Sequence, residues 1–237
     1  MLGKIKAILR HREFRLFKRP YELNIVGIRS TSVRSNSFDD EIHVFYKTEG
    51  INWHYHIYKV TTDPGTYWLR NPIQPQGTAI LSQGQYLNAY QIGLHRGQYT
   101  ALVQRKPVTI LRDYDRNATL DFINGRKDTG LFGINIHRAL AQGTTKVIDK
   151  FSAGCQVFEN VSDFAEFLKL SERHRKLYGN QFTYTLIDLR AVKREGRKQF
   201  AVSAFLGLSL IGYFFEELKT LIINQFKTTN NYGDTNL

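Results

Sequence analysis

The clearest candidates for chemistry are Cys155, the only cysteine of the 237-residue chain, and His137, which lies 18 positions before it. Cys155 follows a Ser-Ala-Gly turn, and His137 ends an apolar, strand-like run. A lone cysteine with a histidine elsewhere in an intracellular-type sequence is typical of a thiol nucleophile and its base. A lone cysteine is also among the most commonly buried residues, so a purely structural role stays open.

The chemistry expected of this pair is acyl transfer. A cysteine attacks a carbonyl as a thiolate, and a histidine can accept the thiol proton and later return it to a leaving amine. Gly154 lets backbone approach a substrate closely, so the N–H groups of Gly154 and Cys155 can form an oxyanion hole. Ser152 can hold the turn by a local hydrogen bond.

Two short motifs carry a family resemblance. Ile136-His137 followed by Ser152-x-Gly154-Cys155 resembles the catalytic motif of the L,D-transpeptidase (YkuD-type) family. Three further segments resemble phage-encoded proteins, from phages of Bacteroidetes, that carry such a domain: TTDPGTYWL (61–69), GQYTALVQRKPVTILRD (97–113) and FGINIHRA (132–139). The similarity covers about residues 60–160.

The resemblance implies a role for each residue of the motif. Cys155 would be the nucleophile, His137 the base, and Ser152 and Gly154 would shape the oxyanion turn. The family acts on peptidoglycan stem peptides at an L-centre next to a D-centre, through a thioester acyl-enzyme and with no cofactor or metal. The phage context favours hydrolysis, in lysis or wall penetration, over cross-linking.

The residues around the motif depart from the family pattern. Arg138 stands where glycine usually follows the histidine, and Ala153 where a second histidine is frequent. Gln156-Val157 stands where the family usually has an apolar residue and then Arg or Asn after the cysteine. Arg138 or Gln156 can therefore recognise the substrate by binding a carboxylate. Arg138 is equally well an exposed charge at a strand end. His95, in a glycine-flanked turn, can line the same cleft, so the predicted substrate-binding residues are Arg138, Ala153, Gln156 and His95.

The sequence predicts a β-rich α+β body over residues 21–189, a YkuD-like mixed sheet or sandwich with one or two packed helices. Short runs rich in Tyr, Phe, Val, Ile and Thr alternate with polar turns. Residues 61–69 predict a type II Pro-Gly turn leading into an aromatic strand. Asn160 or Ser162 can cap a helix running to about Tyr178, and residues 181–189 predict a last strand.

The two ends have a different composition from the body. Residues 1–20 predict a basic amphipathic helix, with helical spacing over 2–19, that packs on the domain or touches an anionic membrane or a partner. Residues 190–198 are basic, and 199–215 contain no charge, which predicts either a membrane-spanning helix or a buried or oligomer-forming one. A polar tail follows. The N-terminus lacks a signal peptide, so we expect synthesis in the cytoplasm without export.

Net charge gives the class of partner. The formal net charge of +12 attracts polyanions. No nucleic-acid-binding motif accompanies it, so we expect an acidic wall polymer or an anionic membrane rather than nucleic acid. One cysteine excludes an internal disulfide, and the oligomeric state stays open.

Other readings compete with thiol catalysis. Residues 113–121 alternate oxygen-bearing side chains as a calcium loop does, but lack its glycine and final glutamate, so a polar turn is expected. His54 and His56, with His95 or His43, are a possible zinc set, although packing within aromatic strands is the default. A third alternative is a non-catalytic virion or membrane-associated protein that binds cell-wall glycopeptide with the same fold.

Overall fold

The computed structural model describes residues 1–190 and 192 and is β-rich, with two sheets. The chain divides into two compact units, Met1–Leu189 and Arg190–Leu237, and the helices and strands of the described residues lie in the first. Its helices are α1 (Leu2–His11), α2 (Thr66–Arg70), α3 (Val161–Tyr178) and the 3₁₀ turn η1 (Asp149–Phe151). Its strands are β1 (Asn24–Arg29), β2 (Asp40–Lys47), β3 (Trp53–Thr61), β4 (Thr78–Leu81), β5 (Gly84–His95), β6 (Tyr99–Gln104), β7 (Val108–Asp113), β8 (Arg126–Gly130), β9 (Ile136–Arg138), β10 (Gln156–Phe158) and β11 (Phe182–Asp188).

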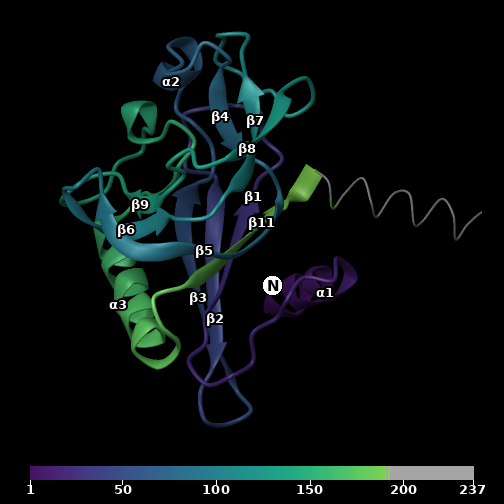
Figure 1. Ribbon diagram of the computed structural model, residues 1–237, viewed down its shortest axis with the longest axis vertical. Coiled ribbons are helices and arrows are strands. Elements are labelled where there is room, and N and C mark those ends of the chain that lie inside the picture. The colour runs from purple at the N-terminus through teal and green to yellow at the C-terminus, as the bar shows by residue number, and fades with distance from the viewer. Residues whose placement is uncertain (191, 193–237) are drawn as a thin grey trace, which may run out of the picture. The chain divides into compact units, whose positions relative to one another are not determined.

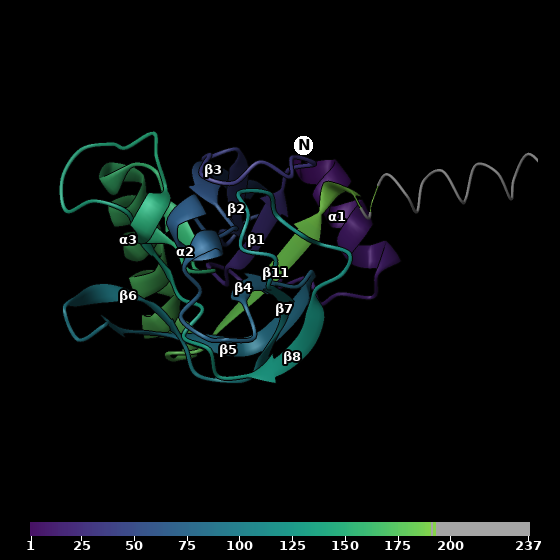
Figure 2. The same cartoon turned by 90° about the horizontal axis from the view of Figure 1, so that it is seen from above.

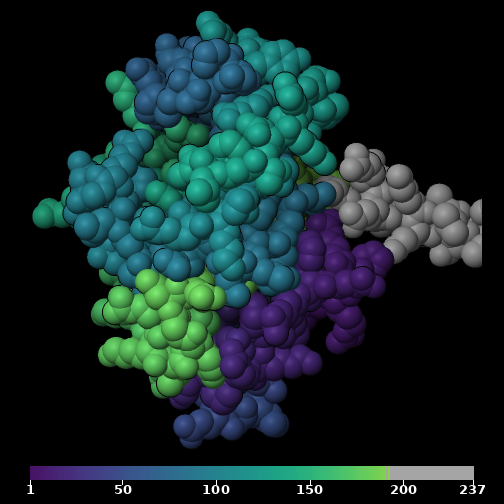
Figure 3. All heavy atoms as spheres, viewed as in Figure 1, coloured from purple at the N-terminus to yellow at the C-terminus, as the bar shows by residue number. Residues whose placement is uncertain are grey.

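Eight strands close into a barrel in the order β1-β11-β5-β6-β9-β10-β3-β2. The β1–β11 and β9–β10 pairs are parallel, and the other barrel pairs are antiparallel. The remaining strands form a separate sheet in the order β4-β7-β8, which lies with α2 at one end of this unit (Figures 1 and 3). The prediction of a β-rich α+β body is confirmed.

Apolar and aromatic side chains fill the barrel. Every residue of β1 and of β11 is buried, including the polar residues Asn24, Thr183 and Thr185. α3 begins as predicted at Asn160, whose side chain accepts a hydrogen bond from the Ser162 N–H at 2.8 Å. Its Phe164 and Phe167 pack on Phe158 of β10, with ring centroids 5.3 and 5.1 Å apart. α3 thus braces the strand that follows Cys155.

The N-terminal helix is shorter than its apolar spacing predicts. It ends at His11, and side chains of the barrel bind the chain that follows: the Gln85 side chain accepts from the Arg15 N–H, and Asn24 accepts from the Phe17 N–H, each at 2.8 Å. These bonds replace the helical ones. Ile5 and Leu9 are each 1% exposed, so the apolar side of α1 packs on the domain. α1 and α3 lie on opposite sides of the unit (Figures 1 and 2).

The prediction of a type II turn and an aromatic strand over residues 61–69 is wrong. Gly65 has φ −74° and ψ 161°, outside the positive-φ region that a type II turn needs, and residues 66–70 form α2. Glycine is needed at position 65 for a different reason. A Cβ there would lie 2.0 Å from the carbonyl oxygen of Asp149, so α2 and η1 can approach closely only at a glycine.

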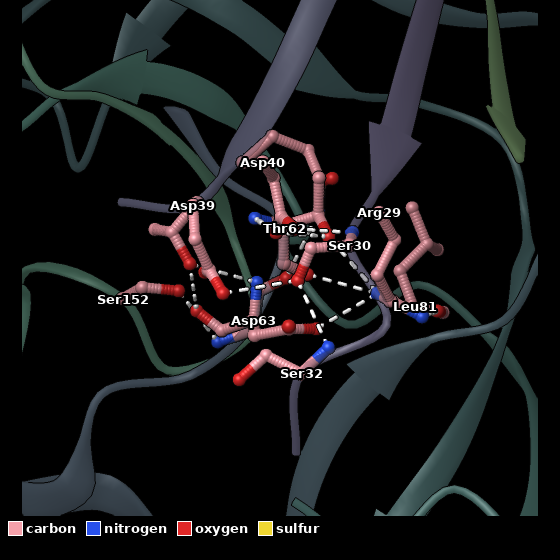
Figure 4. A network of polar contacts seen from close by, with 12 residues as sticks. Arg29, Ser30, Ser32, Asp39, Asp40, Thr62, Asp63, Leu81 and Ser152 are labelled. Atoms are coloured by element: carbon pink, nitrogen blue, oxygen red, sulfur yellow. Dashed lines mark hydrogen bonds and ion pairs between the residues drawn. The ribbon is translucent and has the colours of Figure 1, made fainter. Parts of the chain in front are cut away.

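A buried charged network joins the barrel to the second sheet (Figure 4). The Arg29 guanidinium, 1% exposed, lies 2.8 Å from the Asp63 carboxylate and donates to the Thr62 hydroxyl and to the carbonyls of Thr62 and Leu81, each at 2.9 Å. Asp40 accepts from the backbone N–H groups of Ser30 and Thr62 at 2.7 Å. Burial raises the pKa of the Asp40 carboxyl, and these hydrogen bonds oppose the rise.

No helix within the described part of the chain combines the length and the apolar character that crossing a membrane requires. The predicted apolar helix at 199–215 lies outside the described residues, as do most of the basic run at 190–198 and the polar tail.

Candidate functional site

The parallel pairing of β9 and β10 brings the two motifs together. Ile136 pairs with Gln156, and His137 pairs with Val157. Ile136, Gln156 and Phe158 are fully buried. Because side chains alternate along a strand, Asn135 and His137 lie on the opposite face, and Cys155 precedes β10 in phase with that face. Residues distant in sequence thus share one edge of the barrel.

Two residues shape the turn before Cys155. The Ser152 hydroxyl donates to the Cys155 carbonyl at 2.8 Å and accepts from the Gly154 N–H at 3.1 Å, and Ser152 is fully buried. Gly154 has φ +118°, and a Cβ there would lie 2.3 Å from the Ala79 carbonyl oxygen. Only glycine meets both requirements, so the turn is fixed against β4.

One of the two N–H donors expected to form an oxyanion hole, Gly154 and Cys155, already has a partner within the protein. The Gly154 N–H already donates to Ser152, so it holds the turn instead of facing a substrate. The Cys155 N–H is left as the donor of the expected pair. The prediction of two donors therefore needs correction, because the hydroxyl that stabilises the turn takes one of them.

The Cys155 thiol is partly buried and contacts backbone. Its Sγ lies 3.4 Å from the Gly133 carbonyl oxygen, to which it donates, and 3.4 Å from the Asn135 N–H, from which it accepts. Burial raises the pKa of the Cys155 thiol to about 11, and the Asn135 N–H opposes this by favouring the thiolate. The resting group is therefore a thiol at neutral pH.

His137 is 3% exposed and has one ring nitrogen engaged. Its Nδ1 lies 2.8 Å from the Arg138 carbonyl oxygen and 3.1 Å from the Tyr99 hydroxyl. A carbonyl only accepts, so Nδ1 carries the proton and Nε2 presents a lone pair. Nε2 is buried and has no hydrogen-bond partner within the described residues, Cys155 included. Burial, with the adjacent His95, lowers the pKa of His137 to about 3.

His95 supports His137 directly. The two rings stack with centroids 4.0 Å apart, and His95 Nδ1 lies 3.0 Å from the Asn135 side-chain nitrogen. Burial lowers the pKa of His95 to about 4, so both rings are neutral at pH 7. His95 is only 6% exposed. The structure therefore places His95 in the interior against the His137 ring, rather than at a cleft surface where the sequence suggested it.

The other predicted substrate-binding residues are placed differently from one another. Gln156 is fully buried and bonds to Tyr184 and to the Gly154 carbonyl, which removes its amide from any substrate. Arg138 donates to the Leu140 carbonyl and stacks on the Tyr99 ring at 4.2 Å. The Gln156 amide is thus used within the protein, whereas the Arg138 guanidinium is held through Nη1 and the Tyr99 ring. Ala153 lines a cavity.

A cavity of about 380 Å³ adjoins the Cys155 turn. It lies between α2, the second sheet and the segment before Asn135. The residues that line it include Trp68, Thr78, Ala79, Arg112, Phe132 and Ala153. Its size falls in the range of small-molecule and peptide sites.

The residues proposed as alternative metal ligands make other contacts in the structure. In 113–121 the Asp115, Asn117 and Asp121 side chains accept from backbone N–H groups two or three residues on, which is a chain of local turns. His54 and His56 stack on Tyr46, with centroids 5.4 and 6.0 Å apart. Across the described residues, no three His, Cys, Asp or Glu side chains cluster as metal ligands.

Three residues of the site were not predicted from the sequence. Asn135 contacts both Cys155 and His95, and the alternation in GINIHR could have indicated it, because Asn135 shares the face of His137. Tyr99 and Arg112 come from β6 and β7, and only the folded topology brings them to the site.

Comparison with known proteins found no matching family model, no matching curated protein and no matching solved structure.

Proposed function

We propose that this protein is an L,D-transpeptidase-like (YkuD-like) cysteine peptidase that cleaves or exchanges peptidoglycan stem-peptide bonds through a thioester. The observation that carries the proposal is the His137 imidazole. Its Nδ1 is held by a backbone carbonyl, and its buried Nε2 is unpartnered on the same strand face as Cys155. A base held in one tautomer with its lone pair free is what thiol activation needs.

The reaction follows from these groups. The Cys155 thiol gives its proton to Nε2 of His137 as Sγ bonds to the scissile carbonyl carbon. The tetrahedral oxyanion faces the Cys155 N–H. When the C–N bond breaks, the leaving amine takes the proton from Nε2, and a thioester remains. Water, or the amine of a second stem peptide, then attacks with His137 accepting its proton, and the thiol is restored.

The proton moves during attack rather than before it. A thiol with a pKa of about 11 beside an imidazole with a pKa of about 3 does not form a resting ion pair. The Asn135 N–H, 3.4 Å from Sγ, stabilises negative charge on sulfur as it develops. Hydrolysis, serving phage lysis or penetration of the wall, is the direction we propose.

The test is mass spectrometry of muropeptides incubated with wild-type protein and with Cys155→Ala. We expect the wild type to release or exchange stem peptide and the variant to lose this activity. Alkylation supplies a matched control, because Cys155 is the only cysteine: iodoacetamide should abolish wild-type activity. Equal digestion by Cys155→Ala would exclude the thiol mechanism.

A non-catalytic glycopeptide-binding protein is the second candidate. The resting site favours it in one respect, since thiol and imidazole are both uncharged and unbonded to each other. It predicts that wild type and Cys155→Ala bind stem peptide with equal affinity and that neither turns it over.

A further inference from the structure

The cavity beside the Cys155 turn contains a guanidinium that the proposed chemistry does not use. Arg112, on β7, has a side chain that is only 11% exposed. Its Nη2 lies 3.0 Å from the Asp128 carboxylate, its Nη1 donates to the Gly77 carbonyl at 3.4 Å, and its guanidinium lies 5.0 Å from the Phe132 ring centre. Its Nε is buried and has no hydrogen-bond partner within the described residues.

The Arg112 guanidinium is therefore held in place without being saturated. An arginine has five N–H donors in a planar fork that matches a carboxylate. The Asp128 carboxylate meets Nη2, so this ion pair uses only part of the Arg112 fork and leaves other N–H groups for a second carboxylate.

The cavity continues directly into the candidate catalytic turn. Ala153 lines it two residues before Cys155, so their Cα atoms are at most about 7.6 Å apart, two steps of 3.8 Å. Gly154 packs against Ala79, and Ala79 pairs with Arg112 across the β4–β7 ladder. On the other wall, Phe132 lines the cavity and the neighbouring Gly133 carbonyl contacts Sγ.

We propose that this cavity binds the C-terminal carboxylate of the peptide substrate through Arg112, on the leaving-group side of the scissile bond. The inference rests on the proposed function and narrows it. A terminal carboxylate lies about one residue, or 3.8 Å, beyond the bond that is cut, which matches a cavity two residues from Cys155. Trp68 and Phe132 offer apolar walls for a small side chain such as that of alanine. The enzyme would remove a terminal residue from the stem.

The binding test is made in Cys155→Ala protein, which separates recognition from turnover. The probes are a synthetic tetrapeptide ending in L-Lys-D-Ala and the same peptide with a C-terminal carboxamide, titrated by calorimetry. We expect the carboxylate to bind at least ~10-fold more tightly. Adding Arg112→Gln should reduce this preference below ~2-fold. Arg112→Lys keeps the charge without the fork and should retain an intermediate preference.

Arg175→Gln is the matched control. Arg175 is an ion-paired arginine on α3, 2.8 Å from Glu172, and does not line the cavity. It should leave the carboxylate preference unchanged, and circular dichroism should show every variant folded. Equal affinity for the two probes, absence of binding, or a preference that survives Arg112→Gln would overturn the inference.

Turnover of the same two peptides by protein with Cys155 intact separates the two proposals. Cleavage without any carboxylate preference leaves the thiol chemistry standing and overturns the Arg112 assignment. Arg112-dependent binding without cleavage supports the Arg112 site and excludes the proposed enzyme activity.

Discussion

At the scale of single residues, Gly154 fixes where the thiol can be. Its φ of +118° and its approach to the Ala79 carbonyl leave no room for a side chain. We expect Gly154→Ala to lower the free energy of unfolding by more than about 3 kcal/mol, since backbone strain of about 1–3 kcal/mol adds to a backbone clash. Denaturant unfolding measures this.

Gly143→Ala provides the comparison for Gly154→Ala. Gly143 also has a positive φ, +75°, but a Cβ there would meet nothing within 4 Å. Gly143→Ala should lower the free energy of unfolding by only about 1–2 kcal/mol, the cost of a positive φ for a residue with a side chain. Equal losses at the two positions would show that contact with β4 does not fix the turn.

The raised pKa of the Cys155 thiol gives a test on the free protein. Below a pKa of about 11 the group stays protonated, so the rate of iodoacetamide alkylation should rise about tenfold for each pH unit from 7 to 10. Free cysteine, with a pKa of about 8.5, should level off within this range. Intact-mass spectrometry follows the reaction at the only thiol. A plateau between pH 6 and 8 would instead indicate a resting thiolate–imidazolium pair.

At the scale of elements, α1 is held by its buried side. Ile5 is 1% exposed, whereas Ile8 is only partly buried, although the two residues are chemically identical. Ile5→Ala should lower the free energy of unfolding by about 2–5 kcal/mol, and Ile8→Ala by clearly less. Thermal or denaturant unfolding compares them. Equal, small effects would mean that α1 is not docked and that its apolar side is free for a membrane or a partner.

Some elements could be predicted from the sequence because their signals are local. Asn160 caps α3, Gly179 ends it, and the strand predicted over 181–189 is β11. Residues 61–69 could not be predicted correctly, because the approach of Gly65 to Asp149 decides that turn and is a tertiary contact. The end of α1 likewise depends on Gln85, 70 residues away from Arg15.

The candidate site also combines a part that local sequence predicts with a part that depends on tertiary contacts. Cys155, Ser152 and Gly154 are neighbours in sequence, so their turn could be predicted from residue types. The sequence could not predict that Arg112, rather than Arg138 or Gln156, is the proposed carboxylate-binding residue. That assignment depends on which side chains the barrel buries and on the pairing of β4 with β7, and neither can be read from local sequence.

At the scale of the whole molecule, Arg29 joins the barrel to the second sheet. It bonds to Thr62 after β3 and to Leu81 of β4, beside the carboxylate of Asp63 (Figure 4). Arg29→Leu should lower the free energy of unfolding by about 3–5 kcal/mol, because it leaves a buried carboxylate without its counter-charge. Arg105→Leu, at an exposed position, should change it by less than about 0.5 kcal/mol.

A double-mutant cycle identifies the cause of that loss. If the uncompensated carboxylate is responsible, adding Asp63→Leu to Arg29→Leu should restore part of the stability. Additive losses would instead assign the effect to packing around the guanidinium.

The same network reaches the candidate site. Two residues after Asp63, the Gly65 N–H donates to the Ser152 carbonyl at 2.9 Å. The buried charges therefore hold the segment on which the Cys155 turn rests. A substitution at Arg29 should consequently reduce peptide turnover as well as stability.

The parallel pairing of β1 with β11 has a consequence for synthesis of the chain. β1 ends at Arg29, but its neighbour is complete only at Asp188, 159 residues later. At 5–20 residues per second, a ribosome needs about 8–32 s to supply that neighbour. Throughout this interval the nascent barrel has an open seam with unpaired backbone groups along β1. Association of nascent chains through β1 must therefore be prevented until β11 has been synthesised.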